Sequence, residues 1–68
     1  MKLQINGEER EIPASQTVQD LLLGLGIDPR KVAVERNLEI VPKSLYAEIG
    51  VEEGDKFEIV HFIGGGVL

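Results

Sequence analysis

The residues that could carry chemistry in this 68-residue chain are one histidine, a few serines and several carboxylates. His61 could form a nucleophilic triad with Ser15 or Ser44 and an acidic side chain, since an imidazole can take the serine proton. Simpler local roles explain these residues better. Ser15 lies at a predicted helix start, Ser44 in a turn and His61 inside a predicted strand. The sequence therefore predicts no catalytic residue.

Five carboxylates gather between positions 48 and 58: Glu48, Glu52, Glu53, Asp55 and Glu58. Their spacing matches no calcium-binding loop. The chain also has no cysteine and a single histidine, so we predict no metal site. An acidic run of this kind is usually a solvated face, and the alternative is a docking surface for a basic partner.

Three consecutive glycines, Gly64, Gly65 and Gly66, are followed by Val67 and Leu68. A phosphate-binding loop needs a helix after its glycines, and two residues cannot supply one. A frayed terminus is the simplest interpretation. However, a long β-prone segment leads directly into the glycines, which have no Cβ. We therefore expect a rigid stem with a thin, flexible finger that can deliver a terminal carboxylate into another protein's active site.

The elements that must position this finger begin with a hairpin. Leu3 and Ile5 alternate with polar residues, and Asn6-Gly7 is the dipeptide that a type I′ turn prefers. The return strand is predicted over residues 9–12, before Pro13 removes a backbone donor.

A short helix is predicted next. Thr17 stands three residues before Asp20, as in a capping box, and Gly26 suits a left-handed C-terminal cap. One apolar stripe runs along the helix: Val18, Leu21, Leu22 and Leu25. A helix this short is marginal alone, so a sheet must cover its stripe.

Further strands are predicted over residues 32–34, 38–41 and 57–63, with an irregular connection over residues 43–55. The first and last strands should be parallel neighbours, because the intervening elements supply the long crossover. The expected sheet core is Leu3, Ile5, Val32, Val34, Phe57 and Ile59. Period-two alternation then points Val60 and Phe62 outward, where we expect them to dock on a partner.

Composition narrows the class of protein. The chain has room for one domain, predicted over residues 1–63 with a flexible glycine-rich tail over 64–68. Its net charge of −5 argues against nucleic acid as a partner. No leader or membrane-spanning segment is visible, so we expect a soluble cytoplasmic protein.

Three segments resemble the ubiquitin-like sulfur carriers of thiamine biosynthesis, the ThiS family. They are Ile5-Asn6-Gly7, residues 32–37 (Val-Ala-Val-Glu-Arg-Asn), and residues 54–66, which run from Gly54-Asp55 through the last strand into the three glycines. The resemblance covers nearly the whole chain. It implies an α+β fold of the β-grasp (ubiquitin-like) type, a mixed four- to five-stranded sheet packed on one main helix.

The resemblance also implies a protein cosubstrate and not an enzyme. In that family an E1-like adenylating enzyme uses ATP and magnesium to activate the terminal glycine carboxylate. Sulfur from a sulfur-donating protein then converts it to a thiocarboxylate, which a thiazole synthase uses. Carried over here, the sulfur would be attached at Gly66, and Gly64, Gly65 and Gly66 would enter the partner's active site.

The sequence departs from the family pattern after Gly66, because Val67 and Leu68 follow it. We therefore expect a C-terminal peptidase to remove them. Two alternatives to a thiamine sulfur carrier remain open. The first is a sulfur carrier for cysteine, methionine or molybdopterin synthesis, and the second is a β-grasp interaction module with an incidental glycine tail.

Overall fold

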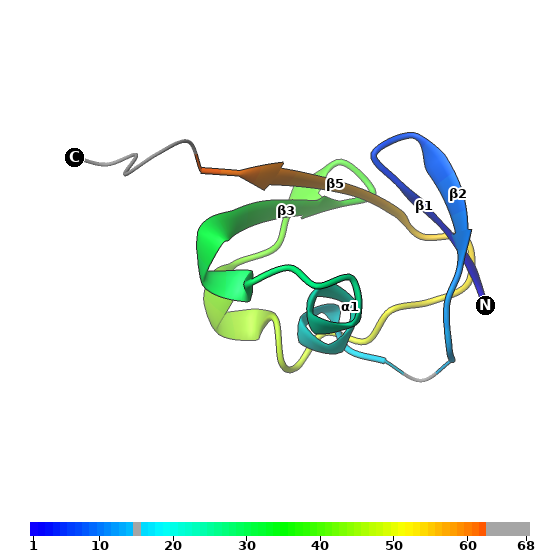
Figure 1. The fold of residues 1–68 in the computed structure, drawn as a ribbon, viewed down its shortest axis with the longest axis horizontal. Helices are drawn as coiled ribbons and strands as arrows, with labels where there is room; N and C mark the ends of the chain where they lie inside the picture. The colour runs from blue at the N-terminus through cyan, green and yellow to red at the C-terminus, as the bar shows by residue number, and fades with distance from the viewer. Residues whose placement is uncertain (15, 63–68) are drawn as a thin grey trace.

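One mixed sheet of five strands covers a single α-helix in the computed structural model, which describes residues 1–14 and 16–62 (Figure 1). The strands are β1 (Lys2–Ile5), β2 (Glu8–Glu11), β3 (Val32–Arg36), β4 (Glu39–Ile40) and β5 (Lys56–His61). The helix is α1 (Val18–Gly24), and two 3₁₀ turns follow it, η1 (Pro29–Lys31) and η2 (Lys43–Leu45). The predicted β-grasp architecture is confirmed.

The strand order is β2-β1-β5-β3-β4, so the last strand in the sequence is the central strand of the sheet. β5 pairs in parallel with β1 and antiparallel with β3. The parallel pair was predicted from the long connection between the first and last strands, which a right-handed crossover requires. This topology places the residues leading into the glycines between two neighbouring strands.

The first hairpin turns at Asn6 and Gly7, with φ values of 50° and 83°. These left-handed conformations are those of a type I′ turn, as the Asn-Gly pair predicts. The Asn6 side chain also bonds β5: its Nδ2 donates to the Ile59 carbonyl at 3.2 Å, and its Oδ1 accepts from the Ile59 N–H at 2.7 Å. One amide therefore continues the β1–β5 pairing beyond the end of β1.

Helix α1 begins with the predicted capping box. The Asp20 N–H donates to Thr17 Oγ1 at 3.1 Å, and the Thr17 N–H donates to Asp20 Oδ2 at 3.2 Å. Gly26 takes φ of 78° just after the helix, where a left-handed residue closes the last turn. Both ends of the helix are thus set by local sequence.

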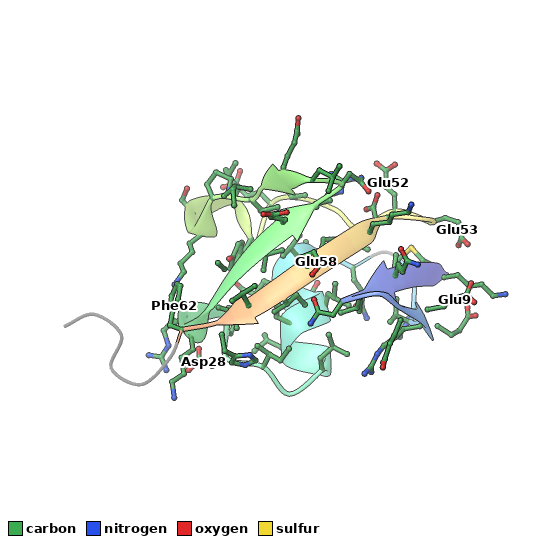
Figure 2. The ribbon with its side chains drawn as sticks, turned by 90° about the horizontal axis from the view of Figure 1, so that it is seen from above. Glu9, Asp28, Glu52, Glu53, Glu58 and Phe62 are labelled. Atoms are coloured by element: carbon green, nitrogen blue, oxygen red, sulfur yellow. The ribbon has the colours of Figure 1, made fainter. Side chains whose placement is uncertain are left out.

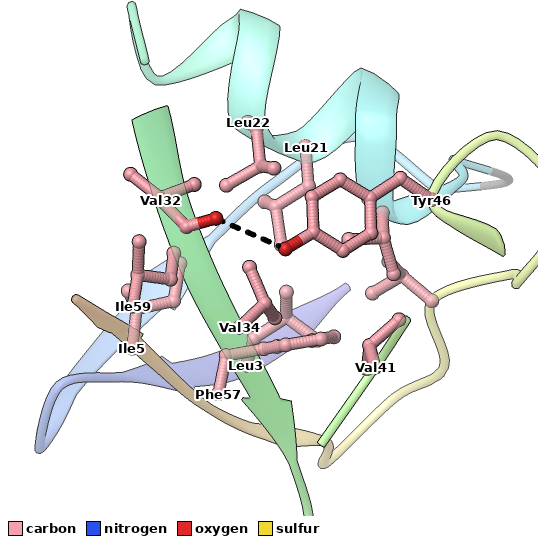
Figure 3. Close-up of a cluster of buried hydrophobic side chains, with 12 residues drawn as sticks. Leu3, Ile5, Leu21, Leu22, Val32, Val34, Val41, Tyr46, Phe57 and Ile59 are labelled. Carbon is pink, nitrogen blue, oxygen red and sulfur yellow. Dashed lines mark hydrogen bonds between the residues drawn. The ribbon is translucent and has the colours of Figure 1, made fainter. Parts of the chain in front are cut away.

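The core lies between α1 and the inner face of the sheet (Figure 3). All six predicted strand residues are buried, as are Val18, Leu21 and Leu22 of the helix. Leu25 is only half-buried, because it is the C-cap residue at the edge of the layer. Three further buried residues were not predicted as core: Val41, Tyr46 and Val51.

Tyr46 shows how the irregular connection contributes to the core. Its side chain is buried, and its hydroxyl donates to the Val32 carbonyl at 3.2 Å (Figure 3). The predicted irregular character of residues 43–55 is confirmed, with one short 3₁₀ turn, η2. The connection nevertheless closes one side of the core.

The described residues form one hydrophobic core cluster, and their only α-helix is too short to cross a membrane. The predicted boundary between residues 63 and 64 lies outside the described residues. The division into a domain and a tail therefore stays a prediction.

Candidate functional site

The candidate site is the end of β5, from which the chain continues into the glycines. His61 is in register with Val32 of β3, and the Phe62 N–H donates to the Lys31 carbonyl at 3.0 Å. The backbone is therefore held as far as Phe62, the last described residue. Gly64, Gly65 and Gly66 lie outside the described residues.

Lys43 contacts the Phe62 ring at the end of β5. The Lys43 ammonium lies 4.5 Å from the centroid of the ring and also donates to the Arg30 carbonyl at 2.8 Å. A cation over an aromatic face is attracted by the ring quadrupole. Phe62 nevertheless keeps 51% of its surface exposed, at the end of the sheet where Figure 2 labels it. Lys43 could not be predicted from the sequence, because the fold alone brings it to Phe62.

Val60 faces outward, as the alternation along β5 predicts. Phe57 and Ile59 are buried beneath the sheet, whereas Glu58 and Val60 are exposed, Val60 by 60%. Val60 lies opposite Ala33 of β3. Two apolar side chains, Val60 and Phe62, therefore stand exposed next to the tail. Their predicted role in docking is not tested by the fold.

The acidic cluster predicted from the sequence does not form one surface. Asp55 is buried, with 6% exposure, while Glu48, Glu52, Glu53 and Glu58 are exposed. Glu58 lies over the middle of the sheet, and Glu52 and Glu53 lie at its edge (Figure 2). The prediction of a solvated face is therefore wrong for Asp55. No group of residues in the described part of the chain could hold a metal ion.

Asp55 joins the start of β5 to the turn between β3 and β4. Its carboxylate accepts from Arg36 Nε at 2.9 Å, from Asn37 Nδ2 at 3.1 Å and from the Glu52 N–H at 2.8 Å. Burial alone would raise the pKa of Asp55, but the three donors outweigh it and hold that pKa below its ordinary value. Asp55 thus orients the strand that carries the tail.

Replacing Asp55 with asparagine is expected to lower the free energy of unfolding by about 1–3 kcal/mol at pH 7, because a charged acceptor is lost from buried donors. The parent protein holds this stabilisation above the unfolded carboxyl pKa of about 3.9 and loses it as pH falls toward the folded value. Urea unfolding between pH 7 and pH 3 should show a steeper loss for the parent than for Asp55→Asn. Equal losses would contradict this role.

The residues considered for a nucleophilic triad have separate places in the structure. His61 is exposed at the end of β5, and Ser44 lies in η2. Among the side-chain hydrogen bonds of residues 1–14 and 16–62, none links His61 to a serine or a carboxylate. Ser15 lies outside the described residues. That His61, Ser15 and Ser44 have no catalytic role therefore stays a prediction from the sequence.

A mixed sheet around one helix, with its central strand leading to three glycines, defines a β-grasp protein of the ubiquitin-like class. The ThiS family model matches residues 3–66. The chain belongs to the ThiS family, whose members are sulfur carriers of thiamine biosynthesis.

Individual relatives agree with this assignment. The sulfur carrier protein ThiS of Bacillus subtilis is 43% identical over 65 residues, which are 94% of this chain and 98% of that protein. A thiazole synthase of Paramagnetospirillum magneticum is 71% identical over 66 residues. That match covers 97% of this chain, but the chain spans only 20% of the thiazole synthase.

A crystal structure supports the fold directly. The thiamine biosynthesis protein ThiS of Geobacter metallireducens superimposes with a TM-score of 0.84 at 32% identity. The match covers 97% of this chain and all of that one. The sheet and the helix of this chain therefore form a fold that is also found in a ThiS protein.

Proposed function

We propose that this chain carries sulfur as a thiocarboxylate on Gly66 and delivers it for thiazole formation in thiamine biosynthesis. The observation that carries the proposal is the family match, which spans residues 3–66 and ends at Gly66. The β5 stem supports it, because backbone hydrogen bonds hold the chain up to Phe62, shortly before the glycines.

The chemistry explains why such a protein needs an activating partner. A carboxylate is ionised at pH 7, with a reference pKa of about 3.3–3.7, and resists nucleophiles. Attack of a Gly66 carboxylate oxygen on the α-phosphate of ATP would release pyrophosphate and give an acyl adenylate. The terminal sulfur of a persulfide on the donor protein could then displace AMP and give an acyl disulfide. A thiol that attacks the donor's own sulfur would form a new disulfide with it and release the thiocarboxylate.

Val67 follows Gly66, so in this sequence the Gly66 carbonyl belongs to an amide. An amide has no carboxylate oxygen to attack ATP. We therefore propose that a peptidase hydrolyses the Gly66–Val67 bond before activation and removes Val67-Leu68. The same requirement holds for any chain in which Val67 follows Gly66.

The proposed partners follow from these steps. They are a peptidase, an E1-like adenylating enzyme that uses ATP and magnesium, a sulfur-donating protein and a thiazole synthase. The 71% identical relative is itself named a thiazole synthase, which favours such an enzyme as the sulfur acceptor. Membership of the ThiS family favours the thiamine pathway over cysteine, methionine or molybdopterin synthesis. The cytoplasmic location stays a prediction.

Intact-mass spectrometry of the protein from its own cells tests the proposal. We expect a species that ends at Gly66, and a second one heavier by the difference between a sulfur and an oxygen atom. The heavier species should disappear after alkylation, which derivatises a thiocarboxylate. Detection of only chains that continue past Gly66 would contradict the proposal and favour a β-grasp interaction module.

We propose that Val60 and Phe62 dock on the adenylating enzyme, since both are exposed beside the tail. Phe62→Asp should then raise the KM for a Gly66-ended chain about tenfold or more, because a charge would be buried in the interface. Leu23→Asp is the matched control, because Leu23 is similarly exposed, at 56%, but lies on α1. Equal KM values for the two variants, with intact circular dichroism spectra, would contradict the docking role.

A further inference from the structure

Two glutamates oppose each other on the outer face of the sheet. Glu35 of β3 is in register with Glu58 of β5, next to the buried pair Val34 and Ile59. Successive side chains of a strand point to opposite faces, so both carboxylates project away from the core. Figure 2, which looks down on this face, shows Glu58 over the middle of the sheet. Directly opposed residues have Cβ atoms only about 4.5–5.5 Å apart, and like charges there destabilise a sheet.

No ion pair in the described part of the chain joins a cation to either glutamate, although the exposed Lys56 lies two residues before Glu58 on the same face of β5. The five ion pairs found among residues 1–14 and 16–62 involve neither Glu35 nor Glu58. Arg36 follows Glu35 directly but bonds Asp55 on the other side of the strand. The folded chain therefore holds two like charges opposite each other, with no ion pair to either of them among the described residues.

Apolar side chains flank the pair toward β4 and toward the tail, whereas Lys56 lies on the side of β1 and the start of β5. Ile40 of β4 is in register with Glu35 and is exposed. On this face Ala33 and Val60 form the next cross-strand pair toward the tail, and Phe62 follows two residues after Val60. Charges of one sign beside exposed apolar side chains suit a partner that presents the opposite charge, because complementary charges steer binding and fix its register. We name this surface the outer sheet face, defined by Ala33, Glu35, Ile40, Glu58, Val60 and Phe62.

We infer that the outer sheet face binds a cationic side chain of the adenylating enzyme, arginine or lysine, between the carboxylates of Glu35 and Glu58. An arginine fits best, because its planar guanidinium donates to two carboxylates in fixed directions. A second copy of this chain does not suit the face, because it would bring another −5 protein and the same glutamate pair against it. This inference rests on the proposed function, and it identifies what the partner must present.

The charge reversal Glu58→Lys tests the inference without threatening the fold. It places an ammonium opposite Glu35, so the cross-strand repulsion becomes an attraction and the thermal midpoint should equal or exceed that of the parent. In a Gly66-ended chain the same change should raise the KM for adenylation about tenfold or more, because it meets the enzyme's cation with a like charge. The dependence of kcat/KM on salt concentration should weaken as well.

Glu9→Lys is the matched control. Glu9 projects from the outer side of β2 at the far edge of the sheet, and its substitution makes the same change in net charge (Figure 2). We expect it to change KM less than about threefold, as a rim charge does. Equal effects of the two substitutions, or an unchanged KM in Glu58→Lys, would overturn the inference while leaving the proposed function intact.

Two other outcomes are also decisive. If the parent Gly66-ended chain is not adenylated at all, the proposed function fails and this inference with it. If the parent sediments as a dimer that Glu58→Lys disrupts, the face binds a second copy, and the inference is overturned.

Discussion

A chain that ends at Gly66 is expected to be adenylated, whereas a chain that continues through Val67 and Leu68 is expected to be inert. The difference should be all-or-none, because only the shorter chain has a carboxylate on Gly66. In the longer chain, the carboxylate of Leu68 lies up to about 7 Å further along an extended backbone, too far from the reacting position. Incubation with the adenylating enzyme and magnesium ATP, followed by pyrophosphate release, measures the difference.

A substitution at Gly65, the residue before the reacting end, should slow adenylation without abolishing it. Gly65→Ala in the Gly66-ended chain adds a Cβ to a segment expected to enter a narrow channel, so the reaction should slow. A Gly66-ended chain with no other change is the reference. Full activity of the Leu68-ended chain would refute the requirement for cleavage.

Leu22→Ala is expected to lower the free energy of unfolding by about 2–5 kcal/mol. Leu22 has no exposed surface and packs between α1 and the sheet, so its truncation leaves a cavity that a small domain cannot fill (Figure 3). Small domains have total stabilities near the lower end of about 5–15 kcal/mol. Much of the stability should therefore be lost, as chemical denaturation monitored by circular dichroism would show.

The adjacent residue is a matched control for this prediction. Leu23 is the same residue type in the same helix, but 56% of its surface is exposed. Leu23→Ala should change the free energy of unfolding by about 0.5 kcal/mol or less. Similar losses in the two variants would mean that the helix, and not the buried stripe, determines stability.

Features set by neighbouring residues were predictable from the sequence. The Asn6-Gly7 turn and the Thr17–Asp20 capping box each depend on a few adjacent residues, and both are present. The inward face of β5 was also predictable, because alternation of apolar residues fixes it. The parallel pairing of β1 with β5 was predictable too, because the connection between these two strands is long enough for a crossover.

Features set by distant residues were not predictable. Tyr46 and Val51 lie in a segment without periodicity, and long-range backbone bonds bring it into place: the Gln19 N–H donates to the Tyr46 carbonyl, and the Val51 N–H donates to the Gln16 carbonyl. Asp55 is buried because Arg36 and Asn37, far away in the sequence, supply its donors.

The same limit applied to the candidate site. The outward direction of Val60 follows from alternation alone, so it was predicted correctly. The contact of Lys43 with Phe62 and the opposition of Glu35 and Glu58 depend on which strands are neighbours and in what register. No pattern within a single segment contains that information.

The most direct test of the central claim is to follow the sulfur itself. A Gly66-ended chain that carries isotopically labelled sulfur as its thiocarboxylate would be incubated with a thiazole synthase and that enzyme's other substrates. We predict that the label appears in the thiazole product in proportion to the chain consumed, and that the chain returns to the unmodified mass. Thiazole formed without the label, or a label retained on the chain, would contradict the claim that this protein donates sulfur.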